Sequence, residues 1–346
     1  MNIEKDAMSV TPSVSVVIAV YKVEEYIAQC CHSLFAQTLK NIEYIFVDDC
    51  SPDKSMDIVQ LVLAEYPDRR GQVKIIRHPQ NMGVSRTRED GVKAATGEYI
   101  IHCDPDDWVE LDMYEQLYNK AVEENADMVL CDLWWHYPED PKPYYDCEKP
   151  KELTSRSILA SCLSAQYPIL HSFLHNKLIR SRLYKMVEWP HEISFCEDMV
   201  VCTQILSLPI SVYHVKRPYY HYRFLRTGSL SNRDYRQEDA EKDLKAIRIL
   251  HKYLIRADDA ELVSFWQSCV ANFMIGTLNA DRRVFTNKVY LEKYRQYRDC
   301  IWKNRCLSPI KKMMLYCATY NYFVAFNLYK FLKYSRSALI KRNSGA

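Results

Sequence analysis

The sequence predicts an α/β fold: a mostly parallel central sheet flanked by helices, followed by an α-helical C-terminal region. Over residues 13–135, short apolar runs typical of strands buried on both faces alternate with stretches of helical spacing. Such alternation is the pattern of a parallel sheet with helical crossovers. Beyond residue 236 the spacing of apolar residues is helical throughout. With 346 residues, the chain can form one large domain with an appendage, or two domains.

The expected strands and helices alternate along the first part of the chain. Strands are expected at five apolar runs: 14–20, 43–48, 73–77, 98–102 and 128–134. Apolar residues three and four apart predict helices at 23–37, 51–63, 84–95, 113–126, 155–164, 200–208 and 236–256. Ser51-Pro52-Asp53 opens the second of these helices, because proline suits the first turn. The Pro-, Tyr- and acid-rich segment 137–150 predicts a loop.

Three carboxylates follow directly on the strand expected at 98–102. They are Asp104, Asp106 and Asp107, within the run His102-Cys-Asp-Pro-Asp-Asp107. Like charges this close repel one another, so the cluster calls for a compensating cation. Mg²⁺ and Mn²⁺ take oxygen ligands and commonly bridge carboxylates to the phosphates of a substrate. The alternative is a solvated turn in which Asp106 or Asp107 caps a helix starting near Trp108.

Two further groups come at the ends of expected strands. Tyr21 follows the first strand and the pair Asp48-Asp49 ends the second. In a parallel sheet, ligands bind in the crevice at the carboxyl ends of the strands. We therefore expect Tyr21, Asp49 and the three carboxylates to converge on one crevice.

Charge and cysteine usage limit the compartment and the partners. No acidic residue follows Asp299, whereas nine Lys and Arg residues do, a pattern that favours anionic lipid over nucleic acid as a partner. The 13 cysteines are scattered without zinc-site spacing, so we interpret them as reduced, mostly buried thiols. Residues 1–13 are polar and lack the apolar core of a signal peptide, so a cytoplasmic protein is expected.

An ordered set of short motifs spans residues 13–230. The motifs are Val14-Ser-Val-Val-Ile-Ala-Val-Tyr21, Val47-Asp-Asp-Cys-Ser-Pro-Asp53, Asn81-Met-Gly-Val-Ser85 with Arg88 and Gly91, Ala94-Ala-Thr-Gly-Glu-Tyr-Ile-Ile101, Asp104-Pro-Asp-Asp107 and Phe195-Cys-Glu-Asp198. In order and spacing they resemble the family 2 glycosyltransferases, inverting enzymes with an A-type nucleotide-sugar-binding fold, here of the bacterial surface-polysaccharide type. The chain departs from the usual family pattern at Ala19, Lys22, Cys50 and Glu89. None of these departures removes a carboxylate that the chemistry needs.

The resemblance implies a nucleoside diphosphate sugar as donor, with a UDP-sugar expected. Ala19 and Tyr21 would line the nucleotide site, with Tyr21 packed against the base. Asp49 matches the family position that accepts a hydrogen bond from the base, typically the N3–H of uracil. The alternative for Tyr21 is a rim aromatic, and for Asp48 a helix cap.

The resemblance also implies which residues bind the diphosphate of the donor. Asp104, Asp106 and Asp107 match the metal-binding acidic motif and would hold Mn²⁺ or Mg²⁺, with Asp106 foremost and Asp104 also facing the donor. Arg223 and Arg226 fall in a segment similar to a loop that closes on the diphosphate, and guanidinium groups suit phosphate oxygens. Each arginine taken alone is equally compatible with a solvated basic loop.

Glu197-Asp198 matches the catalytic pair of the family, with Asp198 as the general base for an acceptor hydroxyl. The alternative is that the pair only caps the helix beginning near Met199. For Arg88, packing of its stem along the sheet is favoured over support of the acidic cluster. The run His175-Asn-Lys-Leu178 resembles a segment near the acceptor. Three other histidines are interpreted as packing residues: His171, His214 and His221.

The predicted function is metal-dependent transfer of a sugar to a glycan or lipid-linked glycan in surface polysaccharide synthesis. The corresponding domains are a flexible 1–12, a catalytic 13–235 with halves 13–135 and 136–235, and a helical 236–346. A silent nucleotide-sugar sensor would lack the acidic motif or the base. An oxidoreductase would need a glycine-rich turn after the first strand, and the chain has only seven glycines. A nucleotidyltransferase would need a glycine-rich basic loop there.

The apolar segment 313–332 is long enough to span a bilayer but is interrupted by Asn321, Asn327 and Lys330. On a helical projection, Lys312, Thr319, Asn327 and Lys330 fall on one polar stripe. This pattern favours a helix lying in the membrane interface, near anionic headgroups, on the cytoplasmic face. The alternative is a core helix packed on the helix expected at 236–256.

Overall fold

The structure is a computed structural model that falls into two compact units. Unit 1 contains residues 1–158 and 170–232, and unit 2 contains residues 159–169 and 233–346. The structure describes residues 11–137, 144–145, 153–163, 172–193, 196–224, 237–254, 260–278, 295–303, 308–320 and 327. The predicted flexible segment 1–12 therefore lies almost wholly outside the described residues, and the division at residue 235 stays a prediction.

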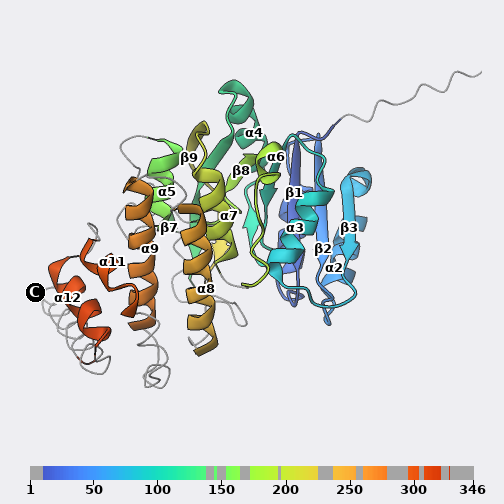
Figure 1. The fold of residues 1–346 in the computed structure, drawn as a ribbon. Helices are drawn as coiled ribbons and strands as arrows, with labels where there is room; N and C mark the ends of the chain where they lie inside the picture. Colours follow the sequence, from blue (N-terminus) through green and yellow to red (C-terminus); the bar gives the residue numbers. More distant parts are fainter. Residues whose placement is uncertain are drawn as a thin grey trace, which may run out of the picture. The chain divides into compact units, whose positions relative to one another are not determined.

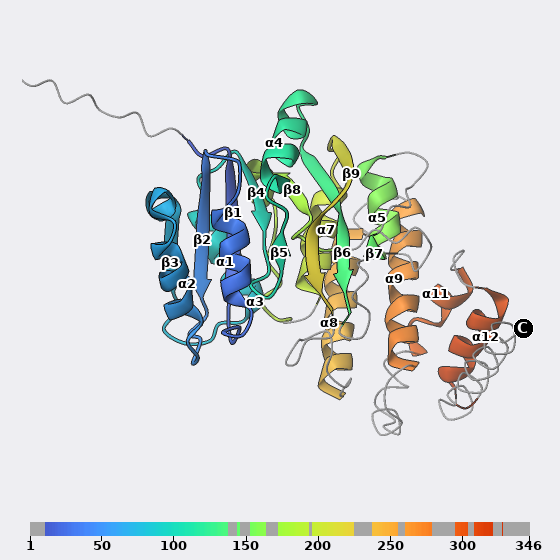
Figure 2. The same ribbon diagram turned by 180° about the vertical axis from the view of Figure 1, so that it is seen from behind.

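Unit 1 is built on one sheet, in which nine strands are found among the described residues. Its order is β3-β2-β1-β4-β8-β6-β9-β5, with β7 paired to β6 (Figures 1 and 2). The parallel part comprises β1 Val14–Val20, β2 Ile42–Asp48, β3 Val73–Arg77 and β4 Tyr99–His102. These four strands confirm the first four predicted. Because β1 is central, the ends of β1, β2 and β4 lie side by side, as a ligand crevice requires.

The helices between these strands cover both faces of the sheet. Helices α1 Ile27–Phe35 and α2 Ser55–Ala64 lie on one face (Figure 2), and α3 Val84–Ala94 lies on the other (Figure 1). Right-handed crossovers explain this arrangement: the chain moves outward from β1 to β3 and then returns to β4 on the opposite side of β1. A short 3₁₀ helix, η1 Pro67–Gln72, precedes β3. Helix α1 is shorter than the predicted 23–37, since residues 21–26 form turns before it.

The other part of the sheet is mixed. It comprises β5 Trp108–Val109, β6 Met128–His136, β7 Tyr144–Tyr145, β8 Lys177–Arg180 and β9 Val212–Arg223. Strand β8 runs antiparallel to β4 and β6, whereas β6 and β9 are parallel. Helices α4 Met113–Glu123, α5 Ser155–Leu163, α6 Ser181–Tyr184 and α7 Glu197–Leu206 complete the described elements up to residue 224. The predicted fold class is thus confirmed, but β5, β7, β8 and β9 were not predicted, and β7 lies in the segment 137–150 that was predicted to be a loop.

A close backbone approach fixes the entry into β4. Gly97 donates its N–H to Ser15 Oγ at 2.8 Å, beside the buried carboxylate of Glu43. A Cβ on Gly97 would lie 2.6 Å from Ser15 Oγ and 2.8 Å from the Ser15 backbone nitrogen. Backbone atoms inside a sheet have little room to move, so a methyl group there must displace β1.

We therefore expect Gly97→Ala to lower the free energy of unfolding by about 1–3 kcal/mol, the usual cost of overpacking. Urea denaturation followed by circular dichroism measures this change. Gly71→Ala is the matched control, because nothing lies within 4 Å of its added Cβ. Equal stability of the two variants would contradict the close approach.

Unit 2 is helical in its described residues, with α8 Gln237–Leu254, α9 Ala260–Leu278, α11 Arg298–Lys303 and α12 Pro309–Ala318. Its core includes Leu250, Trp266 and Leu315, and the Trp266 indole donates to the Ile247 carbonyl at 3.3 Å. Across the described residues, no helix is both long enough and apolar enough to cross a membrane.

The segment predicted to lie in the membrane interface is described only up to residue 320, and Asn327 is the single later position described. The prediction of a polar stripe exposed along this helix is wrong at Thr319, because that residue is fully buried. Its hydroxyl accepts a hydrogen bond from Arg298 Nε at 3.0 Å and donates to the Tyr316 carbonyl at 2.7 Å. In the described part of the segment, Thr319 is therefore a buried, hydrogen-bonded residue of unit 2 and does not face solvent.

Candidate active site

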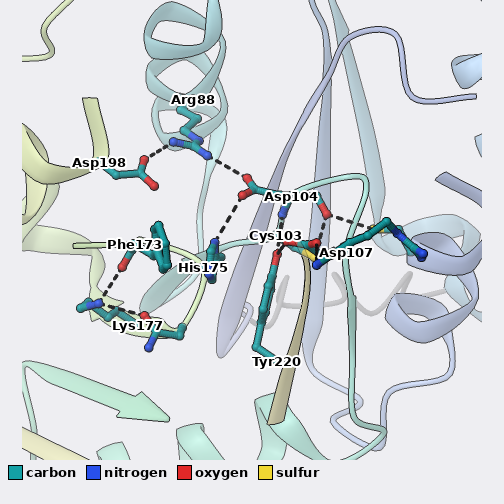
Figure 3. Close-up of polar contacts among 12 residues, drawn as sticks. Arg88, Cys103, Asp104, Asp107, Phe173, His175, Lys177, Asp198 and Tyr220 are labelled. Carbon is teal, nitrogen blue, oxygen red and sulfur yellow. Dashed lines mark hydrogen bonds and ion pairs between the residues drawn. The ribbon is translucent and has the colours of Figure 1, made fainter. Parts of the chain in front are cut away.

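The acidic loop between β4 and β5 follows the carboxyl end of β4, and Figure 3 shows the polar contacts around it. Asp104 occupies the centre of a set of polar contacts. Its Oδ1 accepts a hydrogen bond from Arg88 Nη2 at 2.7 Å, and its Oδ2 lies 3.3 Å from His175 Nδ1. Burial alone would raise the pKa of Asp104, but the charge of Arg88 and the contacts with His175 together outweigh burial and hold this pKa well below its usual range. Asp104 is therefore a carboxylate at neutral pH.

Asp107 is buried and held from both sides. Its Oδ2 accepts a hydrogen bond from the Tyr220 hydroxyl at 2.8 Å, and its Oδ1 accepts one from the backbone N–H of Arg223 at 2.7 Å. The Tyr220 hydroxyl also accepts from the backbone N–H of Asp104 at 3.0 Å. Burial, followed by the charges of Asp106 and Asp104, raises the pKa of Asp107 well above its usual value. A cation at this site would relieve that repulsion.

His175 joins the two carboxylates from the loop before β8. It is 1% exposed, and its ring stacks on Tyr220 with centroids 4.1 Å apart. Ligand atoms of Asp104, Asp107 and His175 all lie within 4.8 Å of one another. Burial lowers the pKa of His175 in spite of Asp104, so the imidazole is neutral and able to act as a ligand. Two carboxylates and a neutral imidazole fit a divalent cation such as Mn²⁺.

The sequence pointed foremost to Asp106, and the structure places it differently. The backbone carbonyl of Asp106 accepts a hydrogen bond from Arg223 Nε at 3.0 Å, and its half-buried side chain is outside the cluster just described. A direct role for Asp106 with a metal stays a prediction. His175 was placed near the acceptor by the sequence but not among candidate ligands.

Arg88 connects the acidic loop to the expected base. Its Nη1 donates to Glu197 Oε1 at 2.6 Å and to Asp198 Oδ1, while its Nη2 reaches Asp104 (Figure 3). The expectation that Arg88 only packs along the sheet is wrong. Arg88 is 6% exposed, and three carboxylates surround its guanidinium. Such a buried cation is stable only with partners of opposite charge.

Helix α7 begins at Glu197, and Asp198 is its second residue. No side chain caps this helix, and Cys196 precedes it in the left-handed conformation, with φ of 65°. Burial raises the pKa of Asp198 to about 7, against the opposing charge of Arg88. A carboxylate with this pKa can accept a proton near neutral pH, as a general base must.

The nucleotide end of the predicted site lies beyond β1 and β2. Tyr21 is 39% exposed, and Ala19 is half-buried in β1. Asp49 is 3% exposed, and its two oxygens already accept hydrogen bonds from the backbone N–H groups of Met82 (2.6 Å) and Gly83 (2.9 Å). The Asp49 carboxylate therefore fixes the turn that starts α3. Its contact with a base stays a prediction.

Arg223 and Arg226 were both predicted to face phosphate oxygens. The Arg223 guanidinium donates to Gln29 Oε1 at 2.7 Å and lies over the rings of Tyr26 and Trp108. It thus sits beside the acidic loop, as its predicted role requires. Arg226 lies outside the described residues.

Two of the three histidines interpreted as packing residues carry polar contacts, and the ring of one of them, His221, also stacks on Trp108 as the packing interpretation expects. His214 Nε2 lies 2.7 Å from Asp132 Oδ1, and both side chains are buried. His221 Nε2 lies 3.0 Å from Glu110 Oε1. His171 lies outside the described residues.

Comparison with known proteins relates this geometry to a family. The sequence model of Glycosyl transferase family 2 matches residues 15–181, which contain nearly all of β1, the acidic loop and His175. Over those residues the match confirms the resemblance drawn from the ordered motifs. Outside the matched region, Asp198 and Arg223 are tied to it by the contacts of Arg88 and Asp107.

The chain is similar to the putative glycosyltransferase EpsH of Bacillus subtilis, with 35% identity over 229 residues that cover 62% of this chain and 61% of EpsH. The chain spans between about a third and three fifths of the length of the first curated relatives that it matches.

Solved structures share the fold. The Staphylococcus aureus TarS fragment 1–349 in complex with UDP-GlcNAc has a TM-score of 0.70 at 19% identity, with 92% of this chain and 91% of that chain covered. The mannosyltransferase PcManGT of Pyrobaculum calidifontis, in complex with GDP-Man and Mn²⁺, has a TM-score of 0.53 at 14% identity, with 92% and 87% covered.

Proposed function

We propose that the protein is an inverting glycosyltransferase that moves a sugar from a nucleoside diphosphate sugar to a hydroxyl of a glycan or lipid-linked glycan. Surface polysaccharide synthesis is the proposed context. One observation carries the proposal: Arg88 ties the carboxylate expected to act as base, Asp198, to the acidic loop through Asp104. The two groups that an inverting transfer needs, an anchor for the diphosphate and a base for the acceptor, therefore lie on either side of one guanidinium.

The proposed chemistry assigns one task to each group. Asp198 accepts the proton of the acceptor hydroxyl as that oxygen attacks the donor sugar. Asp104, Asp107 and His175 would hold a divalent cation, which when bound supplies positive charge to the leaving diphosphate. Arg223, whose Nε donates to the Asp106 carbonyl, adds a positively charged guanidinium next to the acidic loop.

The donor is proposed to be a UDP-sugar. The family relationship and the fold shared with TarS, whose structure holds UDP-GlcNAc, support this choice over the GDP-Man held by PcManGT. The exposed ring of Tyr21 is available to pack against a base. A screen of UDP-, GDP- and dTDP-sugars for hydrolysis in the presence of Mn²⁺ tests the proposal. No hydrolysis of any of these sugars would count against it.

The metal site gives a second test. We expect Mn²⁺ to bind the protein and Asp107→Asn to weaken that binding by at least about tenfold, because a charged ligand is lost. Titration followed by electron paramagnetic resonance of free Mn²⁺ measures the affinity. Asp106→Asn is the matched variant one residue away. An equal loss in both would make Asp106 a ligand as well, and loss in Asp106→Asn alone would overturn the cluster of Asp104, Asp107 and His175.

Peripheral membrane association through the C-terminal helices is part of the proposal. Ile310, Met313 and Tyr320 are exposed on or just after α12, and Lys312 lies among them. Exposed apolar side chains next to lysine suit the interface of an anionic membrane. We expect the purified protein to float with anionic liposomes at low salt and to lose this association as salt rises. Flotation with neither anionic nor neutral liposomes would favour a core role for this segment.

A further inference from the structure

His78 is a histidine at the edge of the sheet whose ring is buried. It directly follows β3, the strand at one end of the sheet (Figure 1), and its backbone N–H donates to the Asp48 carbonyl at 2.9 Å. Its chain neighbours Arg77 and Pro79 are exposed, whereas the His78 side chain is only 7% exposed. Burying an imidazole is costly unless polar partners hold it, so its partners should explain why the ring turns inward.

Both nitrogens of the His78 ring face carboxylates. Nδ1 lies 2.8 Å from Asp49 Oδ1, and Nε2 lies 3.3 Å from Asp90 Oδ2. Asp90 belongs to α3 and is itself held by Arg86, whose Nε donates to the same oxygen at 3.0 Å. The ring is therefore fixed between the end of β2 and helix α3, with one nitrogen directed at Asp49.

The contacts of Asp49 use its two oxygens unequally. Oδ1 accepts a hydrogen bond from the backbone N–H of Met82 at 2.6 Å and another from Nδ1–H of His78. Oδ2 accepts one from the backbone N–H of Gly83 at 2.9 Å. A carboxylate has about four lone-pair sites, two on each oxygen. In the described part of the chain, Oδ1 is therefore saturated, and Oδ2 keeps one acceptor site.

This carboxylate lies next to the end of β1. The backbone N–H of Asp49 donates to the Val20 carbonyl at 3.0 Å, and Tyr21, whose ring is exposed, follows Val20 directly. The Asp49 side chain is 4% exposed, and its hydrogen bonds to three donors prevent it from turning. A base packed against Tyr21 would meet an acceptor whose orientation is already fixed.

The nucleobases differ in what their hydrogen-bonding edges require of a carboxylate. Uracil and thymine present one N–H between two carbonyl oxygens, and a single site on Oδ2 satisfies it. Guanine presents two adjacent N–H donors, which need both oxygens, so one donor would stay unpaired against a saturated Oδ1. Cytosine and adenine place the lone pair of a ring nitrogen at this edge, and a carboxylate repels it. The contacts of Asp49 therefore favour uracil or thymine.

We propose that His78 is a positioning residue that selects uracil or thymine over guanine, because it occupies Asp49 Oδ1 and leaves only Oδ2 for the base. This inference rests on the proposed function, since it concerns the base of the nucleotide donor at the same site. His78 acts through Asp49 and does not itself contact the nucleotide.

Calorimetric titration with UDP, CDP and GDP in the presence of Mn²⁺ tests the proposal. We expect the native protein to bind UDP at least about tenfold more tightly than either CDP or GDP. In His78→Leu, the freed site on Asp49 Oδ1 should reduce the preference for UDP over GDP by about tenfold. The preference for UDP over CDP should persist, because both oxygens still repel the cytosine ring nitrogen.

Two further variants separate this role from packing. His78→Asn should keep both preferences, since its amide nitrogen is as many bonds from Cα as Nδ1 and can donate to Asp49. His32→Leu is the matched control, because His32 is a half-buried histidine whose Nδ1 lies 3.1 Å from the Tyr66 hydroxyl instead. The native protein gives a test that needs no variant: N3-methyl-UDP, which lacks the N–H, should bind at least about tenfold more weakly than UDP.

The outcomes separate this inference from the proposed function. An unchanged preference for UDP over GDP in His78→Leu would overturn it, as would equal binding of UDP and N3-methyl-UDP. Equal losses in His78→Leu and His78→Asn, or the same loss in His32→Leu, would reduce His78 to a packing role. Tighter binding of GDP than UDP, with hydrolysis of a GDP-sugar, would overturn the inference and leave a glycosyltransferase. Failure to bind any of these nucleotides or to hydrolyse any nucleotide sugar would count against the function itself.

Discussion

Asp198→Asn is expected to lower the turnover of sugar transfer by roughly 10²–10⁴, the range for loss of a general base, while donor binding stays nearly intact. The amide keeps the size and the contact with Arg88 but cannot accept a proton. Steady-state transfer and calorimetric titration with UDP measure the two quantities. Glu192→Gln is the matched control, because it changes an exposed carboxylate in the segment just before α7.

The pH dependence of turnover gives a second readout for Asp198. Burial raises the pKa of its carboxyl to about 7. Only the ionised carboxylate accepts a proton, so turnover of the native protein should rise with pH through about 7 and level off above it. This rise should be absent in Asp198→Asn. Loss of UDP affinity in the variant would place Asp198 in the donor site, and near-normal turnover would leave it a helix-start residue.

The parallel part of the fold could be predicted because its strands are buried on both faces. Strands β1 and β2 are almost continuous apolar runs, and such runs are typical of this environment. Strand β9 has no such pattern. Its central residues, Lys216, Arg217 and Pro218, are unusual for a strand, and it pairs with β6 across a register shift at Asp132. This segment forms a strand because it pairs with β6, and its own residues do not favour one.

The residues of the candidate site likewise fall into those that the sequence predicted and those that it did not. The acidic loop and Asp198 were predicted because each is a compact motif next to an element boundary. His175 was missed as a ligand because it lies 71 residues from Asp104, and only the antiparallel insertion of β8 beside β4 brings the two together. Its only sequence signal was the run His175-Asn-Lys-Leu178, which placed it near the acceptor rather than at a metal.

The role of Arg88 was predicted wrongly, although a signal was present. Helix α3 buries the face that holds Ser85 and Gly91, and Arg88 lies between them on that face. A charged residue on the buried side of a helix needs partners of opposite charge, because an unpaired charge is costly there. Its partners Asp104 and Asp198 are 16 and 110 residues away, so the sequence alone could not identify them.

Arg88→Met is expected to abolish transfer and to lower the free energy of unfolding by about 3–5 kcal/mol, the range for removing one partner of a buried ion pair. Methionine fills the space of the arginine stem but leaves Asp104, Glu197 and Asp198 without their shared cation. Urea denaturation measures the loss. Arg86→Met is the matched control two residues earlier, where an exposed guanidinium pairs with Glu89 and Asp90, and it should cost no more than about 1 kcal/mol.

A double variant separates electrostatics from packing. If the loss in Arg88→Met comes from carboxylates left unpaired, then adding Asp198→Asn removes one of those charges and should restore part of the stability. If the loss comes from the missing side-chain volume, the second substitution should not restore any. Arg88→Lys, which keeps the charge but cannot reach three carboxylates with one fork, should fall between the native protein and Arg88→Met in stability. Native stability in Arg88→Met would contradict the ion-pair network and, with it, the coupling of the base to the acidic loop.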